Sequence, residues 1–295
     1  MPREIALLTN PTSGKGRGAK ARAAVRDRLA ASGARVADLQ GRDGDEALDL
    51  ARQAVADGVE ALVVIGGDGM VHLGVNAVAG SETTTPTTTL GIIPAGTGND
   101  VARYFDIPRK DPLAAADLVV AGATRTVDLA RSGTTYYTTV LSAGFDAIVN
   151  ERANGMTWPK GQMRYNLATV AELRTFTPLH YTLDLDGSTR QLEAMLVAVG
   201  NGPSFGGGLR ITEGASLEDG LLDVVVIKPM SRLELVRTYP KLFKGTHTTH
   251  PKYERHRVRQ VTVASPGITA YADGERFGAL PLTVECVPGA LRVYA

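Results

Sequence analysis

Two glycine-rich segments place polar side chains where a phosphate and a metal ion could bind. Residues 66–69 (Gly-Gly-Asp-Gly) follow the apolar run 62–65, and residues 94–100 (Pro-Ala-Gly-Thr-Gly-Asn-Asp) follow the apolar run 90–93. Glycine lets the backbone turn sharply and lets a ligand approach the main chain. A carboxylate such as Asp68, among exposed N–H groups, suits a phosphate bridged by a metal ion. The competing interpretation is a tight turn in which Asp68 is only a helix N-cap.

Both apolar runs are typical of buried parallel strands, and helical spacing follows each of them. Further strands are expected at 5–9 and 34–39, with helices at 19–31 and 45–55. This alternation predicts a doubly wound α/β domain over residues 1–124. Ligands bind at the carboxyl ends of strands in such sheets, so the two glycine segments should form one crevice.

The loop after the first strand could also contact phosphate. Residues 10–18 (Asn-Pro-Thr-Ser-Gly-Lys-Gly-Arg-Gly) offer small residues, hydroxyl groups and two cations. The loop is not a Walker A motif, because no Gly-Lys-Ser/Thr ends it. A flexible basic loop before a helix is the alternative.

Near residue 125 the pattern changes to strand after strand, with helical spacing only at 164–176 and 231–243. We therefore expect residues 125–287 to form a second, mainly antiparallel β-sandwich domain. No long linker separates the two parts, so they should pack closely around a cleft.

Composition narrows the class of protein. The chain has 295 residues, 43% of them hydrophobic, and a net charge of +1, so no global field would draw it to nucleic acid. Cys286 is the only cysteine, which excludes a disulfide within the chain. No apolar run has the length and flanks of a signal peptide or membrane span. We expect a soluble, cytoplasmic protein whose membrane contact is peripheral.

The order and spacing of six segments resemble the diacylglycerol kinase-like lipid kinase family, in its soluble, YegS-like bacterial branch. The segments are 10–14, 66–69, 94–100, 206–208 (Gly-Gly-Gly), 216–223 (Ser-Leu-Glu-Asp-Gly-Leu-Leu-Asp) and 273–275 (Asp-Gly-Glu). The resemblance implies an α/β nucleotide-binding domain, completed by a last strand within 288–295, and a β-sandwich, with the active site between them. It also implies ATP as phosphoryl donor, Mg²⁺, and a lipid hydroxyl as acceptor, with diacylglycerol giving phosphatidic acid.

The resemblance assigns roles to single residues. Glu275 matches the proposed general base, and we expect Asp68 to orient the catalytic magnesium. A turn at the rim of the site is the alternative for Glu275. A second magnesium site would use the Asp219 carboxylate with the carbonyls of Ser216 and Leu221. The residues expected at the nucleotide are Asn10, Thr12, Ser13, Gly66, Gly67, Asp68, Gly69, Met70, Val71, His72, Gly96, Thr97 and Asn99.

Three positions depart from the family pattern. Met70 and His72 stand where threonine and asparagine are usual, and Gln40 stands where a threonine commonly helps to bind nucleotide. Two alternatives therefore stay open: an NAD kinase-like enzyme, since NAD kinases share the Gly-Gly-Asp-Gly loop, and a nucleotide- or lipid-binding regulator without catalysis.

The sequence leaves the membrane-facing surface and the oligomeric state open. The cations and histidines between Lys241 and Arg259 are interpreted either as a basic face for anionic lipid or as a solvated helix end and loop, with the second preferred. Trp158 could touch lipid, although a buried anchor is the commoner role for tryptophan. A homodimer is compatible with the resemblance.

Overall fold

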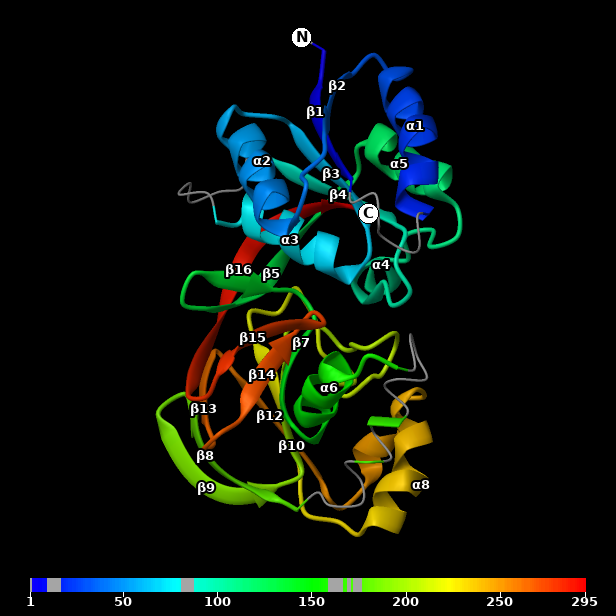
Figure 1. Cartoon of the computed structure of the whole chain (residues 1–295). Coiled ribbons are helices and arrows are strands. Elements are labelled where there is room, and N and C mark those ends of the chain that lie inside the picture. Colours follow the sequence, from blue (N-terminus) through cyan, green and yellow to red (C-terminus); the bar gives the residue numbers. More distant parts are fainter. Residues whose placement is uncertain (1, 10–16, 81–87, 159–166, 169–170, 172–176) are drawn as a thin grey trace.

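The computed structural model describes residues 2–9, 17–80, 88–158, 167–168, 171 and 177–295. The chain forms an α/β half that contains both termini and a β-rich half beneath it in Figure 1. This confirms the predicted fold class, an α/β domain followed by a β-sandwich.

The N-terminal half alternates strands and helices, as predicted. Its elements are β1 (Glu4–Thr9), α1 (Arg17–Ala30), β2 (Arg35–Leu39), α2 (Gly44–Ala56), β3 (Ala61–Gly66), α3 (Asp68–Val78), β4 (Thr89–Pro94), α4 (Asp100–Tyr104) and α5 (Pro112–Ala121).

Strands β3 and β4 position the two glycine segments. All six residues of each strand are buried, because α1 and α5 cover one face of the sheet while α2 and α3 cover the other (Figure 1). The two strands are parallel neighbours, with Gly66 beside Pro94. Both loops therefore leave the same edge of the sheet.

The C-terminal half consists mostly of strands. Its elements are β5 (Thr124–Ser132), β6 (Thr135–Tyr137), β7 (Val140–Gly144), α6 (Phe145–Gly155), β8 (Leu179–Leu185), β9 (Ser188–Ala194), β10 (Leu196–Gly200), β11 (Leu222–Ile227), α8 (Arg232–Leu242), the 3₁₀ helix η2 (Thr246–Thr249), β12 (Tyr253–Val258), β13 (Gln260–Ala264), β14 (Thr269–Ala272), β15 (Glu275–Ala279) and β16 (Leu282–Tyr294).

Two sheets enclose the second core. One has the order β12-β11-β10-β7-β14-β15, and the other contains β16, β13, β8 and β9. Apolar side chains from both sheets, such as Leu141, Val199 and Val261, are fully buried between them. Apolar residues alternate with polar ones along β8 and β13, as expected where only one face of a strand is covered.

One long strand joins the two halves. β16 pairs with β13 over residues 282–285, continues beside β5, and reaches the first sheet where Val293 lies beside Leu90 of β4. The return of the last strand is thus confirmed. The last strand predicted within 288–295 is part of a longer one, since residues 282–294 form a single strand with an irregularity between Val287 and Leu291. The exact domain boundaries remain a prediction.

Several local expectations need correction. Residues 253–258, expected in a solvated loop, form β12, because they pair with β11, and Arg255 and Arg257 also meet Asp223 and Asp219. Helix α6 was not expected. Trp158 is 76% exposed and is therefore no buried anchor. Most of the helix expected at 164–176 lies outside the described residues. Within the described parts of the chain, no helix is long and apolar enough to cross a membrane.

Candidate active site

The two glycine loops touch each other. A Cβ atom added to Gly67 would lie 3.1 Å from the Gly96 Cα atom, and one added to Gly98 would lie 2.5 Å from Oδ2 of Asp68. Side chains at these positions would force the loops apart. Glycine is therefore required here by the close approach of two backbones, and the two loops lie together at one edge of the sheet.

Asp68 ties the loops together instead of capping its own helix. The N-cap of α3 is Gly67, which makes no side-chain hydrogen bond. The Asp68 carboxylate accepts hydrogen bonds from the backbone N–H groups of Asn99 and Asp100, both at 2.8 Å. The N-cap interpretation of Asp68 is therefore wrong, and its carboxylate is committed to the second loop.

Asn99 holds the second loop in shape. Its backbone is left-handed, with a φ of 53°. Its side-chain oxygen accepts a hydrogen bond from the Gly96 N–H at 3.1 Å, and its side-chain nitrogen donates to the Gly96 carbonyl at 3.0 Å. Thr97, at the tip of this loop, is exposed. The loop is thus braced from within and presents Thr97 outward.

Negative charge accumulates around Asp68. Burial, followed by the charge of Asp100, raises the pKa of Asp68 to about 6, although the two backbone hydrogen bonds act in the opposite direction. Asp100 itself is only 4% exposed. A divalent cation at this point would relieve the repulsion between the carboxylates.

Glu275 reaches this crevice from the other half of the chain. A Cβ atom added to Gly69 would lie 2.8 Å from Oε1 of Glu275. Asp273 and Gly274 have φ values of 52° and 86°, so they form the tight turn between β14 and β15. Glu275 is the first residue after this turn, and its side chain is exposed. The structure therefore brings Glu275 beside the glycine loops.

A buried ion pair fixes that turn against α3. Nδ1 of His72 lies 3.0 Å from Oδ2 of Asp273, whose side chain is 1% exposed. Asp273 also accepts hydrogen bonds from the N–H and hydroxyl groups of Thr138 and Thr139. Burial acts to lower the pKa of His72, but the hydrogen bond and charge of Asp273 outweigh it and raise that pKa. Burial likewise acts to raise the pKa of Asp273, which His72 and Thr139 hold below its usual value.

Comparison with known proteins finds matches for both halves of the chain. Residues 4–132 match the model of the diacylglycerol kinase catalytic domain, and residues 139–295 match the YegS C-terminal NAD kinase β-sandwich-like domain. A diacylglycerol kinase of Mycobacterium tuberculosis H37Rv is 43% identical over 98% of this chain and 94% of its own length. The chain belongs to the YegS-like bacterial lipid kinase family.

Other similar proteins are more distant. A diacylglycerol kinase of Bacillus subtilis 168 is 28% identical over 93% of this chain and 90% of its own length. A crystal structure of a diacylglycerol kinase from Bacillus anthracis Sterne superimposes with a TM-score of 0.80 at 24% identity, covering 99% of this chain and 96% of that one. The fold is thus shared along the whole length of this lipid kinase.

Two of the residues expected at the nucleotide of this lipid kinase have buried side chains. Met70 and Val71 are 6% and 4% exposed in the N-terminal core, and their N–H groups donate to the Gly67 carbonyl. Both residues are therefore held by the core and by this helix turn, and contacts of these two positions with a nucleotide remain a prediction. Gln40 accepts a hydrogen bond from Arg22 of α1 at 2.6 Å. Asn10, Thr12 and Ser13 lie outside the described residues.

Sequence reasoning missed Asp100 as a residue of the site. Its carboxylate accepts hydrogen bonds from the Gly207 N–H at 2.7 Å and the Ser204 hydroxyl at 3.1 Å. Arg103 donates to the carbonyls of Gly98 and Gly207. These bonds join the second glycine loop to the 203–209 turn of the C-terminal half. The sequence did contain a signal for this contact, because Asp100 and Gly207 both belong to segments that carry the family resemblance.

The expected second magnesium site remains a prediction. The Asp219 carboxylate accepts hydrogen bonds from Arg257 and from the Leu221 N–H. Within the described residues, the carbonyls of Ser216 and Leu221 accept no hydrogen bond, so this oxygen donor set fits a hard cation. Arg257 would compete with the cation for the Asp219 carboxylate. No group of three or more His, Cys, Asp or Glu side chains among the described residues could hold a metal on its own.

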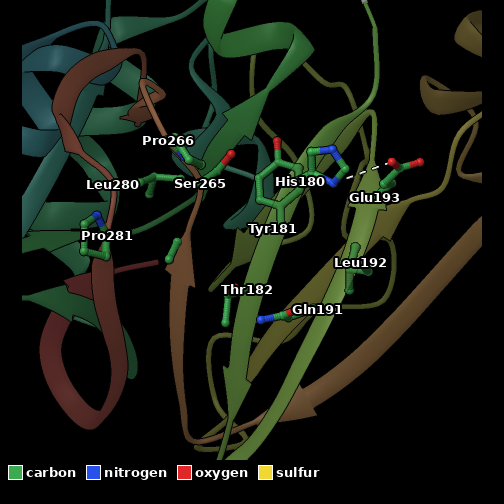
Figure 2. Close-up of a pocket in the computed structure, with 11 residues that line it drawn as sticks. His180, Tyr181, Thr182, Gln191, Leu192, Glu193, Ser265, Pro266, Leu280 and Pro281 are labelled. Atoms are coloured by element: carbon green, nitrogen blue, oxygen red, sulfur yellow. Dashed lines mark ion pairs between the residues drawn. The ribbon is translucent and has the colours of Figure 1, made fainter.

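A separate cavity of about 730 Å³ lies away from these residues, along β8 and β9. Figure 2 shows His180, Tyr181 and Leu192 on its strand side, opposite Pro266 and Pro281. None of the predicted site residues lines this cavity. The crevice between the glycine loops and Glu275 is therefore the better candidate for catalysis.

Proposed function

We propose that this lipid kinase transfers the γ-phosphate of ATP to the hydroxyl group of diacylglycerol, giving phosphatidic acid, with Mg²⁺ as cofactor. The observation that carries the proposal is the position of Glu275, whose carboxylate lies against Gly69 at the start of α3. Phosphoryl transfer needs anion-binding groups and a proton acceptor at one point. In this proposal the N-terminal half supplies the anion-binding groups, and the C-terminal half supplies the proton acceptor.

The N-terminal half would bind the phosphates. The start of α3 directs N–H groups and the positive end of the helix dipole into the crevice, which favours an anion. Gly67 and Gly69 have no side chain that would cover these groups. Bound Mg²⁺ would neutralise charge on the transferred phosphoryl group. Asp68, whose pKa is raised by burial and then by the charge of Asp100, is the residue of this chain that would hold the cation, directly or through water.

The C-terminal half would act on the lipid. As the acceptor oxygen forms its bond to the γ-phosphorus, the bond from that phosphorus to the β–γ bridging oxygen breaks. The carboxylate of Glu275 takes the proton of the attacking hydroxyl group. The turn at Asp273 and Gly274 places Glu275, and the pair with His72 anchors this turn to the helix that begins at the first glycine loop.

An acceptor screen tests the proposal. The purified chain is incubated with Mg²⁺ and γ-labelled ATP, and with diacylglycerol in mixed micelles, a sphingoid base in mixed micelles, or NAD. We expect label in phosphatidic acid, and none with Asp68→Asn or Glu275→Gln. Glu193→Gln, on the rim of the cavity in Figure 2, is the matched control and should keep activity.

Other outcomes would refute the proposal. Label in NADP alone would indicate an NAD kinase-like enzyme. Tight ATP binding without transfer to any acceptor would indicate a regulator. Label in a sphingoid base but not in phosphatidic acid would keep the lipid kinase and reject diacylglycerol.

A further inference from the structure

Helix α8 exposes a row of large apolar side chains. Leu233, Val236, Tyr239 and Phe243 are 59%, 53%, 43% and 50% exposed. Their spacing of three or four residues places them along one side of the helix. Of the seven large apolar side chains that are this exposed among the described residues, four lie in this row, which we call the outer row of α8.

The fold does not need the outer row. The opposite side of α8 packs Leu235 and Leu242 against the core cluster that contains Ile211. A capping box at Ser231 and Glu234 fixes the start of the helix, and the Leu242 carbonyl near its end accepts a hydrogen bond from the Arg210 N–H. In Figure 1, α8 lies at the outer end of the C-terminal half, far from the N-terminal half. The outer row is thus a rigid apolar surface facing solvent.

Positive charge flanks the outer row. Arg232, Arg237, Lys241 and Lys244 are all exposed, and none forms an ion pair with a described residue. The one acid of the helix, Glu234, is engaged by the Ser231 N–H and by Nε2 of His250 at 3.3 Å. Unpaired cations beside exposed apolar side chains are the pattern of a helix that lies in a membrane interface.

We propose that the outer row and its four flanking cations dock this protein on an anionic lipid bilayer. The proposal rests on the proposed function in one respect, since a long-chain acceptor must be taken from a bilayer. A second copy of the chain is the less suitable occupant. A two-fold interface would bring the same unpaired cations of both copies together, with no free acid on the helix to meet them.

Vesicle co-sedimentation tests this docking without any turnover. The full chain is mixed with vesicles of phosphatidylcholine alone or with added phosphatidylglycerol. We expect binding to the anionic vesicles that falls with added salt. The double substitution Val236→Ser, Phe243→Ser should weaken binding at least about tenfold. Arg237→Gln with Lys241→Gln should weaken it roughly thirtyfold, and only on anionic vesicles.

Leu113→Ser is the matched control. Leu113 is 43% exposed on α5, in the other half of the chain, and this variant should bind vesicles like the wild type. All variants should also phosphorylate a short-chain, water-dispersed diacylglycerol at the wild-type rate, whereas activity on vesicles should fall with binding. Loss of binding with no kinase activity in any variant or the wild type would reject the proposed function and keep the docking surface.

Two results would overturn the docking proposal. The first is that the Val236 and Phe243 double variant, or the Arg237 and Lys241 double variant, binds vesicles as tightly as the wild type. The other is a wild-type dimer in light scattering that the Val236 and Phe243 double variant converts to a monomer without a change in vesicle binding. The outer row would then be an interface between copies.

Discussion

Replacement of Asp68 by asparagine should stabilise the protein at neutral pH while it abolishes catalysis. The folded-state pKa of Asp68 is about 6, against about 3.9 in an unfolded chain. This difference of about two pKa units corresponds to about 3 kcal/mol. Because the folded pKa is raised, folding favours the protonated carboxyl. Its contribution is fully present below about pH 4 and is lost as pH rises through about 6.

Asparagine cannot ionise, so the variant avoids that loss. Its amide oxygen can still accept one of the two backbone N–H groups, which limits the cost to about 1 kcal/mol. We therefore expect Asp68→Asn to be about 1 kcal/mol less stable than wild type at pH 4 and about 2 kcal/mol more stable at pH 7.5. Urea unfolding at a series of pH values, without Mg²⁺ or nucleotide, measures this difference.

The control for this experiment is Asp117→Asn. Asp117 forms an exposed ion pair with Arg28, of a kind that contributes under about 1 kcal/mol, so its variant should stay close to wild type at every pH. A constant difference between Asp68→Asn and wild type from pH 4 to 7.5 would refute the reasoning. It would mean that the backbone hydrogen bonds from Asn99 and Asp100 fully offset the burial of Asp68.

Four further predictions follow from the site. Glu275→Gln should lower kcat about 10²- to 10⁴-fold in the micelle assay while ATP affinity in calorimetry stays unchanged; an unchanged kcat would remove Glu275 from the role of base. Below about pH 6.5, where the raised pKa of His72 keeps it protonated, Asp273→Asn leaves a buried cation without its partner and should cost about 3–5 kcal/mol in urea unfolding, whereas a loss below about 1 kcal/mol would contradict a buried pair. Since the pKa of His72 is raised, the stability from this pair is full below about pH 6.5 and declines as pH rises through the folded value; His72→Asn should lack that decline. Asp219→Ala should reduce the rise in Tm that we expect from added Mg²⁺, and an equal rise in both proteins would reject the second magnesium site.

The parts of the site that are local in sequence could be predicted. Strands β3 and β4 are uniformly apolar and end in glycine, so the position of both loops follows from the pattern and from the geometry of parallel sheets. Strand β12 could not be predicted in this way. It has charged residues on both faces, and it is a strand because it pairs along its whole length with β11, and Asp219 and Asp223, more than thirty residues earlier, also meet its arginines.

Contacts between the two halves of the chain also could not be predicted from local sequence patterns. His72 and Asp273 are 201 positions apart, and nothing in the sequence between them signals that one side chain will meet the other. His72 departs from the usual asparagine of the family, a change that by sequence suggested altered nucleotide contact. In the structure the imidazole instead points to the turn before Glu275. The substitution therefore affects how the two halves are joined, which bears on the acceptor side of the reaction.

This reassignment changes how the departures from the family pattern should be judged. Met70 is packed in the core and its N–H is used within the helix, so its side chain need not be compatible with a nucleotide. His72 forms a charged link that an asparagine could replace only by a neutral one. Neither change removes a group from the crevice formed by Gly67, Asp68 and Glu275. If the protein were a regulator that had lost catalysis, the loss should appear among those three residues, and all three are present, with Asp68 bound to the second glycine loop and Glu275 against Gly69 of the first.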